Sequence, residues 1–289
     1  MISNSFAWTR DLDARDGIDF VFPATPGGAP ESFLPDSDSE RAYAEAHAGD
    51  HCSVEPCGAR FALWPAALVA DPSRARMLVF YGKISAGVGL FNFTSAGDSI
   101  AVWKDFDTPP DRGPAAAPMM FTRVNELYGN AAVVEGDDLY VYGCGAGKPY
   151  TRPCRVARVP LGDALDRSRW VYYAGGGWSS SPSDAVPVLD ADDVLSVAYD
   201  AYLSSYLAVY APPLTNHVMM RTSKRPEGPW SDATTAFAAK APSELWVYDA
   251  HAHPEYERDG GRVEYVTYSR TTGGGAGEIR LVRVELCGS

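Results

Sequence analysis

Apolar and polar residues along this chain are arranged in short runs that are typical of β-strands. Residues 262–268 and 279–284 alternate between apolar and polar with a period of two, which predicts half-buried strands. Residues 77–81 form a nearly continuous apolar run that is rich in strand-forming residue types. Turn-forming residues separate the runs, for example at 71–74 and 135–138. The pattern therefore predicts an all-β protein.

The predicted strands fall into four successive groups, and a short helix is predicted at 38–48. The strands cover 62–69, 76–83, 89–93 and 99–104; then 130–134, 139–143, 155–160 and 169–174; then 194–199, 206–211 and 217–223; and finally 251–256, 262–270 and 278–285. A repeat of roughly 50 residues with about four strands is the signature of a β-propeller blade. One four-stranded sheet cannot bury both of its faces alone, so neighbouring blades must cover them. A β-sandwich, which is the alternative, predicts no such period.

The repeats predict a five-bladed β-propeller that is incomplete at its N-terminus, because the chain opens in the middle of a further blade. On this interpretation residues 1–289 form a single propeller domain. Residues 1–57 are the remnant of the first blade and a connection, and residues 58–286 form about four further blades.

Composition narrows the class of partner. The formal net charge is -12 and the pI is near 4.8, which disfavours nucleic acid and anionic membrane surfaces. No run approaches the roughly 18 consecutive apolar residues of a membrane span. A neutral polysaccharide or oligosaccharide meets no electrostatic penalty. We therefore expect a carbohydrate partner, no nucleic acid, no membrane insertion and a monomeric protein.

Five cysteines indicate an oxidising compartment. Two pairs are close in sequence, Cys52 with Cys57 and Cys144 with Cys154, and each pair is predicted to form a disulfide. Free thiols and a zinc site are the alternatives, although neither pair has the spacing of a zinc finger. Cys287 is left over. A secreted, periplasmic or cell-surface protein is predicted, and since residues 1–20 contain no signal peptide, we expect an upstream segment to be missing.

Several segments in order along the chain resemble a bacterial family. They are residues 3–13, 16–20, 63–65, 79–81, 129–134, 139–143, 196–203, 228–231, 252–255 and 267–269. Together they resemble the family called domain of unknown function 4185, which is connected with glycoside hydrolase family 183, the endo-D-arabinanases. The Gly-Pro-Trp-Ser motif at 228–231 recurs in many sugar-acting propellers, so the ordered series is more specific than any one motif.

The resemblance implies an enzymatic function and a missing N-terminal segment. It implies a glycoside hydrolase that cleaves an arabinofuranose-containing polysaccharide by carboxylate acid/base catalysis, without an organic cofactor. Relatives carry an upstream Gly-Asp-Thr-like strand, and related five-bladed hydrolases take a catalytic carboxylate from that first blade. We therefore expect this chain to begin after that residue. A non-catalytic propeller that binds carbohydrate or protein, and an inactive truncated fragment, are the alternatives.

Glycoside cleavage needs two carboxyl groups that face one cleft. In a propeller these come from loops that lead into the innermost strands. Glu126 precedes such a strand and is the candidate general acid, with Glu244 as a weaker competitor, and the alternative is a surface carboxylate. Asp249 is the candidate base or substrate ligand, or else a turn cap or a histidine partner. Asp184 is a third catalytic candidate or a turn residue, and Asp200 is expected at the opposite mouth.

Further candidates would bind substrate. His251 and His253 alternate on one predicted strand, so they share a face and could bind sugar hydroxyls or an axial metal ion, with Glu255 as a partner. Hydrogen-bonded structural histidines are the alternative. Aromatic rings stack on sugars but more often pack between blades. The remaining candidates for substrate binding are Trp64, Tyr128, Asn130 and Trp178.

Overall fold

The computed structural model describes residues 4–49, 51–89, 92–105, 107–114, 117–123, 126–145, 147, 151–192, 194–240, 246–273 and 276–287. The chain divides into two compact units. Unit 1 consists of Met1–Trp8 and Phe20–Gly129, and unit 2 consists of Thr9–Asp19 and Asn130–Ser289. Among the described residues, no helix is both long enough and apolar enough to cross a membrane.

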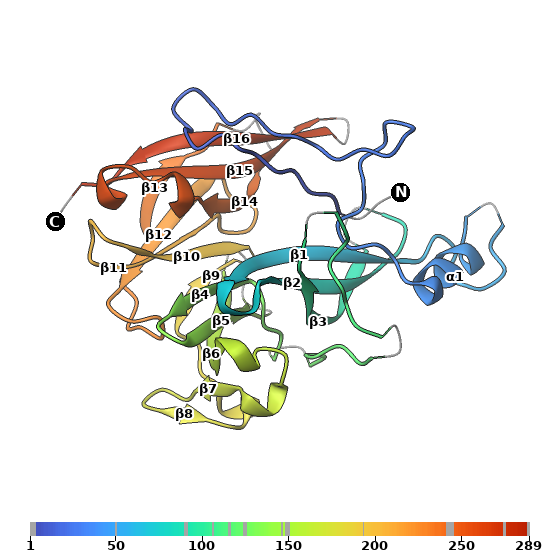
Figure 1. Ribbon diagram of the computed structural model, residues 1–289, viewed down its shortest axis with the longest axis horizontal. Coiled ribbons are helices and arrows are strands. Elements are labelled where there is room, and N and C mark those ends of the chain that lie inside the picture. The colour runs from blue at the N-terminus through green and yellow to red at the C-terminus, as the bar shows by residue number, and fades with distance from the viewer. Residues whose placement is uncertain are drawn as a thin grey trace. The chain divides into compact units, whose positions relative to one another are not determined.

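The described residues of unit 1 form one α-helix and one three-stranded antiparallel sheet (Figure 1). The elements are α1 (Asp38–Ala46), β1 (Arg60–Asp71), the 3-10 turn η1 (Pro72–Arg74), β2 (Arg76–Ala86) and β3 (Phe93–Trp103). Their core contains Leu63, Val79 and Trp103, which pack against Phe33 and Leu34. The predicted helix at 38–48 and the predicted turn at 71–74 are confirmed.

Glu40 fixes helix α1 to its surroundings in unit 1. Its side chain completes a capping box with Ser37, the N-cap of the helix. The same buried carboxylate forms ion pairs with Lys83 of β2 at 2.7 Å and with Arg112 at 2.6 Å. Burial alone would raise the pKa of Glu40, but the bonds to Arg112 and Lys83 outweigh it and hold the pKa well below its ordinary value.

In unit 2 the part of the chain that the structure describes forms three sheets, built from strands that follow one another in sequence (Figure 1). The first has the order β4-β5-β6-β7-β8, with β9 paired to β6; the second has β10-β11-β12-β13, and the third has β14-β15-β16. The strands are β4 (Ala131–Glu135), β5 (Asp138–Cys144), β6 (Arg152–Pro160), β7 (Val171–Tyr173), β8 (Trp178–Ser179), β9 (Leu189–Ala191), β10 (Leu195–Asp200), β11 (Ser205–Tyr210), β12 (His217–Ser223), β13 (Thr234–Ala238), β14 (Val247–Ala252), β15 (Val263–Gly273) and β16 (Ala276–Glu285). Short 3-10 turns are η2 (Leu161–Asp163), η3 (Arg167–Arg169), η4 (Pro182–Asp184), η5 (Pro254–Tyr256) and η6 (Asp259–Gly261).

The first strands of the three sheets in unit 2 lie next to one another, in the order β4, β10, β14. The backbone N–H of Ala252 in β14 donates to the Oγ of Ser196 in β10 at 2.8 Å, which ties two of these strands together. Buried side chains of one sheet pack on the next, as Tyr142 and Val156 do with Leu195 and Tyr206. Successive sheets whose first strands adjoin are the arrangement of β-propeller blades, so the predicted all-β, blade-like architecture is confirmed.

Three predicted strands differ clearly from those observed. Separate strands are predicted at 89–93 and 99–104, but β3 begins at Phe93 and runs to Trp103, paired with β2 across a bulge opposite Lys83; residues 90 and 91 lie outside the described part of the chain. The strand expected at 251–256 is wrong in its bounds, since β14 starts at Val247 and stops at Ala252. Pro254 cannot donate a ladder hydrogen bond, and it opens η5 instead.

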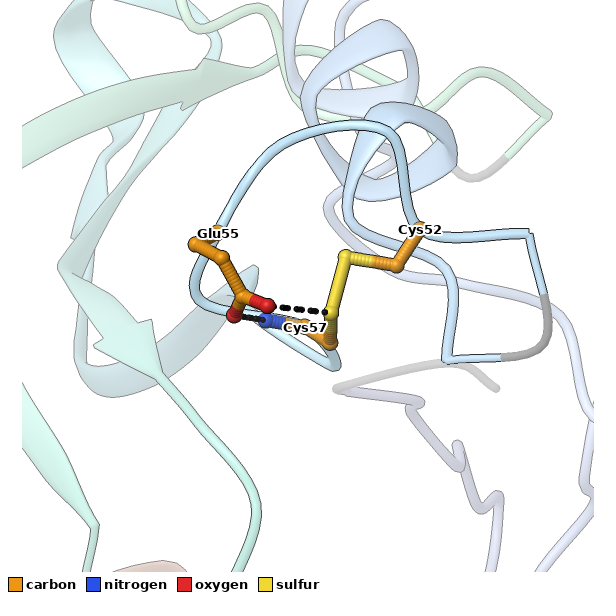
Figure 2. A group of neighbouring side chains, drawn as sticks. All are labelled: Cys52, Glu55 and Cys57. Atoms are coloured by element: carbon orange, nitrogen blue, oxygen red, sulfur yellow. Dashed lines mark hydrogen bonds between the residues drawn. A yellow bond between two sulfur atoms is a disulfide. The ribbon is translucent and has the colours of Figure 1, made fainter.

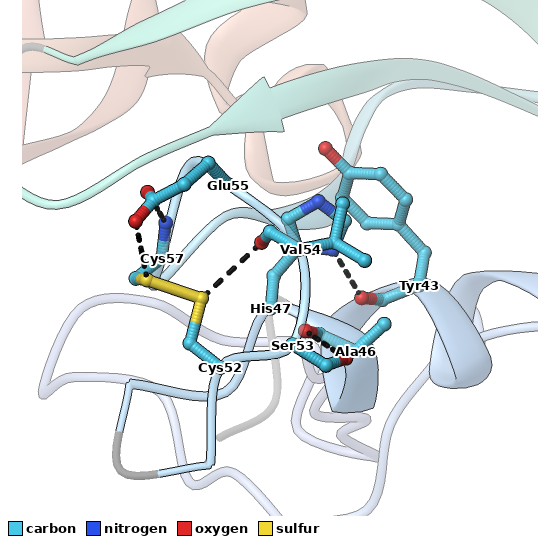
Figure 3. The surroundings of a disulfide bond; sticks show 8 residues. All are labelled: Tyr43, Ala46, His47, Cys52, Ser53, Val54, Glu55 and Cys57. Carbon is cyan, nitrogen blue, oxygen red and sulfur yellow. Dashed lines mark hydrogen bonds between the residues drawn. A yellow bond between two sulfur atoms is a disulfide. The ribbon is translucent and has the colours of Figure 1, made fainter.

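Both predicted disulfides are present. Cys144 and Cys154 lie opposite each other on β5 and β6 and join these neighbouring strands. Cys52 and Cys57 close a short loop after α1 (Figure 2). That loop is held to the helix, because the N–H and Oγ of Ser53 both donate to the carbonyl of Ala46 (Figure 3). Cys287 is a free, exposed thiol.

Candidate functional site

Asp249 lies at an irregular point of β14, the first strand of its sheet. Tyr248 pairs with Ser269 and His251 pairs with Thr267, so β14 carries one residue more than β15 between these pairs. Asp249 occupies this bulge with a φ of 55°, a left-handed conformation that aspartate tolerates better than most residues. The extra residue lets Ala250 remain fully buried in the core while the Asp249 side chain reaches solvent.

The surroundings of Asp249 favour its protonated form. Although the side chain is accessible, protein atoms replace much of its hydration, and this desolvation raises its pKa to about 6. No described residue forms an ion pair or a hydrogen bond with the carboxylate. The pKa of the adjacent Tyr248 is also raised, by burial and by the charge of Asp249. An accessible carboxyl group with a pKa this close to neutrality can both accept and donate a proton.

The two candidate histidines have different environments. His253 lies just beyond β14, and both of its ring nitrogens are engaged: Nδ1 with Glu255 Oε1 at 2.9 Å, and Nε2 with Thr267 Oγ1 at 2.8 Å. The pKa of Glu255 is lowered because the bond to His253 outweighs the opposing effect of burial. The expected Glu255 partnership is therefore present, and His253 is held as a structural histidine would be.

His251 is the less constrained of the pair. Its ring lies 5.4 Å from that of His253, between centroids. Burial lowers the pKa of His251 to about 4, with a further contribution from His253, so the ring is neutral at pH 7. No hydrogen bond to this ring comes from the part of the chain that the structure describes. A neutral imidazole without a protein partner can bind a sugar hydroxyl.

The other catalytic candidates belong to different elements from Asp249. Asp184 lies in η4 and its Oδ2 accepts a hydrogen bond from Ser179 Oγ at 2.6 Å. Ser179 belongs to β8, which is at the opposite edge of its sheet from β4, so Asp184 is not brought to the first strands. Glu126 belongs to unit 1, where its carboxylate lies 3.5 Å from Arg123. Glu244 falls outside the described residues.

The remaining substrate-binding candidates are mostly engaged in packing. Tyr128 is buried against Phe121, with ring centroids 5.4 Å apart, which matches the packing alternative. The Trp178 ring lies in β8 and is covered by the Arg158 guanidinium at 4.7 Å. The Oδ1 of Asn130 accepts the N–H of Cys144 at 2.8 Å, so Asn130 positions the end of β5.

Trp64 is the exposed member of the set of aromatic candidates. Its side chain is 41% exposed in unit 1 and makes an edge contact with the Phe93 ring. This exposure leaves part of its ring face available for stacking on a sugar.

A cavity of about 230 Å³ opens in unit 2 beside the ends of β9 and β11. Its polar lining includes Thr151, Asp190, Tyr210 and Arg221, and the Arg221 Nε donates to the Tyr210 hydroxyl at 3.1 Å. Arg221 also donates to the carbonyl of Ser231, and no described residue forms an ion pair with Asp190. A few polar groups in a small concave site are what a sugar ring requires. No local sequence pattern predicts this cavity, because its residues come from strands that are far apart in the chain.

The residues do not fit the axial metal suggested for His251 and His253, because both nitrogens of His253 are already bonded. Among the described residues, one group of three or more His, Cys, Asp or Glu side chains brings its ligand atoms within 4.8 Å of one another: Cys52, Glu55 and Cys57. Figure 2 shows that the two sulfurs of this group are bonded to each other, which removes the thiolates that a metal would need.

Comparison with known proteins identifies relatives of the fold. A protein from Bacteroides ovatus that is provisionally described as a hydrolase is similar with a TM-score of 0.52 and 20% identity, over 75% of this chain and 56% of that one. An α-L-arabinanase from Cellvibrio cellulosa, in complex with arabinohexaose, is similar with a TM-score of 0.48 and 11% identity, over 76% and 73%. The Notoamide biosynthesis cluster protein J' of Aspergillus versicolor is 28% identical over 128 residues, which are 42% of this chain and 33% of that protein.

These relatives are longer than the matched region. The chain spans 56% of the Bacteroides ovatus structure and about a third of the fungal protein. A family match covers more of the chain: residues 91–272, well over half of its length, match the family described as Domain of unknown function (DUF4185). This chain therefore belongs to the DUF4185 family.

Proposed function

We propose that this protein is a propeller glycoside hydrolase that cleaves an arabinofuranose-containing polysaccharide, with Asp249 as general base and Glu126 as general acid. The observation that carries the proposal is Asp249: an accessible carboxyl group on the first strand of a sheet, with a pKa raised to about 6. The resemblance of the ordered segments to endo-D-arabinanases supplies the substrate class. The two disulfides support an oxidising, extracellular compartment.

The chemistry follows from the pKa of Asp249. A glycosidase base must be ionised at the working pH and yet bind a proton more strongly than an ordinary aspartate does. At pH 7 a carboxyl with a pKa of about 6 is mostly ionised, and it is a stronger base than one with an ordinary pKa of about 4. His251, neutral and near this carboxyl in sequence, would bind a sugar hydroxyl.

The test is release of reducing sugar from arabinogalactan and α-L-arabinan, with glucan as the control substrate. Asp249→Asn should lower the rate by about 10²- to 10⁴-fold. Asp166→Asn is the matched control, since Asp166 caps the distant turn η3 and asparagine can keep that cap. The wild-type rate should rise as pH increases through about 6, because the base must be ionised. Full activity of Asp249→Asn would refute the assignment.

A second candidate function is carbohydrate binding without cleavage. The cavity lined by Asp190, Tyr210 and Arg221 favours it, because these polar groups could hold a sugar whether or not a bond is broken. Calorimetric titration with arabinan oligosaccharides separates the two. Binding that is weakened by Arg221→Ala, together with no product release from any substrate, would favour the binding function over the hydrolase.

A further inference from the structure

Two carboxyl groups are buried together at the junction of two sheets in unit 2, away from Asp249 along the strands. Asp200 is the last residue of β10, and Glu264 is the second residue of β15. Asp200 is 2% exposed and Glu264 is 3% exposed. Gly261, three residues before Glu264, lies against the Asp200 carboxylate, and Asp200 is among the groups that raise the pKa of Glu264. The pair therefore joins the sheet that begins with β10 to the sheet that begins with β14.

The hydrogen bonds of Asp200 leave one oxygen unsatisfied. Its Oδ1 accepts the N–H of Leu203 at 2.7 Å, which closes the turn between β10 and β11. Its Oδ2 is buried, and no described residue donates to it. Two carboxylates can only accept hydrogen bonds, so Glu264 can satisfy this oxygen only when Glu264 itself carries a proton. A buried acceptor without a donor is costly, which favours that protonated form.

The groups around the pair add negative rather than positive charge. From the segment after β14, Glu257 and Glu255 both act on Glu264. The neighbouring His253 is bonded to Glu255. The side chain of Thr267 on β15 is occupied by His253.

The nearby cations are engaged elsewhere. Arg258 pairs with Asp13, Arg262 pairs with Glu285, and Lys224 donates to the carbonyls of Leu203 and Ser204. Within the described part of the chain, no Lys or Arg forms an ion pair with Asp200 or Glu264. The pair therefore lacks a guanidinium or ammonium group to offset its charge.

Backbone packing closes the remaining side of the pair. Gly261 of η6 lies so near that a Cβ built on it would be 2.6 Å from Asp200 Oδ1 and 2.8 Å from Oδ2. A metal ion is a poorer explanation than a proton. The ligand-atom cluster at Cys52, Glu55 and Cys57 is the one that meets metal-site spacing among the described residues, and it includes neither Asp200 nor Glu264.

We propose that Asp200 and Glu264 hold one proton between them at neutral pH, so that the junction between the β10–β13 and β14–β16 sheets weakens as this proton is lost at alkaline pH. This proposal concerns the stability of the fold and stands independently of the proposed hydrolase activity.

The pKa values agree with the geometry. Burial first, and then the charges of Asp200 and Glu257, raise the pKa of Glu264 to about 8. Burial and Asp200 also raise the pKa of Glu257. A carboxyl whose pKa is higher in the folded protein binds more protons there than in the unfolded chain. Its stabilising contribution is complete below its ordinary value of 4.5 and is lost as pH rises towards about 8.

The experiment compares the Tm of the wild type with that of Glu264→Gln at pH 5, 7 and 9. The glutamine amide reproduces the donor of the protonated acid but cannot ionise. We expect the variant to melt several degrees above the wild type at pH 9, with a gap that nearly closes at pH 5. Glu285→Gln is the matched control, because Glu285 is more exposed and lies on the neighbouring strand. The difference in Tm between this variant and the wild type should not grow between pH 5 and 9.

A second variant protects the test against a local packing effect of the glutamine. Asp200→Asn keeps an oxygen for the N–H of Leu203 and presents an amide donor to Glu264. The Tm of this variant should therefore also rise relative to that of the wild type as pH increases. For both variants, a Tm difference from the wild type that stays constant between pH 5 and 9 would overturn the proposal. A wild-type Tm that rises with millimolar CaCl₂, and does so in neither variant, would also overturn it by showing that a cation occupies the place of the proton.

Discussion

The chain turns from the first to the second strand of a sheet at Asp71 in unit 1 and at Asp200 in unit 2. Both aspartates end their strands, and both are buried. Asp71 lies opposite Arg76 in the ladder, and the Arg76 Nε binds its Oδ2 at 2.8 Å. Asp200 lies opposite Ser205, which offers no charge, and its Oδ2 is buried without a donor among the described residues. The residue that pairs with each aspartate across the turn, Arg76 or Ser205, therefore decides whether the buried carboxylate forms an ion pair.

The difference shows that one backbone turn can neutralise a buried carboxylate in two ways. Burial alone would raise the pKa of Asp71, but the bonds from Ser73 and Arg76 outweigh it, and its pKa is lowered. At the other turn the pKa of Glu264 is raised. The first turn contributes most above the ordinary aspartate pKa and loses its contribution in acid, whereas the second loses its contribution in alkali.

Removing Asp71, the partner of the Arg76 guanidinium, should have the largest effect on stability. Asp71→Ala takes the carboxylate away from Arg76, whose side chain is only 12% exposed, and we expect a loss of about 3–5 kcal/mol in the free energy of unfolding. Urea denaturation at pH 7 measures it. Asp71→Ala combined with Arg76→Met should recover part of the loss, since the buried charge is then gone from both sides. A loss below about 1 kcal/mol would show that the ion pair is dispensable.

A milder change at the same residue tests the sign of the pH dependence. Asp71→Asn keeps an acceptor for Ser73 but loses the charge, and we expect a cost of about 2 kcal/mol at pH 7. Because the Asp71 pKa is lowered in the folded protein, this cost should shrink as the solution is acidified. Glu264→Gln should show the reverse trend towards alkaline pH. Parallel pH trends for the two variants would remove the distinction between the turns.

A methyl group added beside Asp200 should cost about 1–3 kcal/mol. Gly261→Ala places a Cβ against the carboxylate at a φ of 98°. Gly260→Ala is the matched control, because its φ of 67° is also left-handed but nothing lies within 4 Å of the added atom. The excess loss of the first variant over the second, from urea denaturation, isolates the contact with Asp200. Equal losses of stability for the two variants would show that the Asp200 carboxylate does not contact the Cβ at position 261.

The sequence predicted the turn at 71–74 and most strands, because alternation and turn residues are local signals. It could not predict the environment of Glu264. Alternation places Glu264 on the opposite face from Val263 and Tyr265, which normally means exposure to solvent. All three are buried, because Ala14 and Ile18 of the segment Thr9–Asp19 cover the face with Val263 and Tyr265, while Glu264 lies at the junction with the sheet that begins with β10. Glu264 and Asp200 are also far apart in the chain, so no local pattern connects them.

The candidate site was also predictable only in part, because local sequence signals do not show how strands pair and pack. Asp249 stood out as a carboxylate ahead of a predicted inner strand, and the structure places it on β14. The bulge that exposes it depends on pairing with β15, which the alternation of β14 alone does not reveal. The position of Trp178 and Tyr128 near strands predicts a role in sugar binding, but tertiary packing covers the first and buries the second.

The smallest expected effect concerns the outer cation of the Asp71 turn. Arg74 lies 3.4 Å from Asp71 Oδ1, but its side chain is 49% exposed, so water already screens the charge that it offers. We expect Arg74→Ala to cost less than about 1 kcal/mol, and adding 0.5 M NaCl should reduce even this difference. If Arg74→Ala instead costs as much as Asp71→Asn, the second guanidinium shares the buried charge equally. The contrast between the turns would then rest on two cations rather than on the single residue that faces each aspartate.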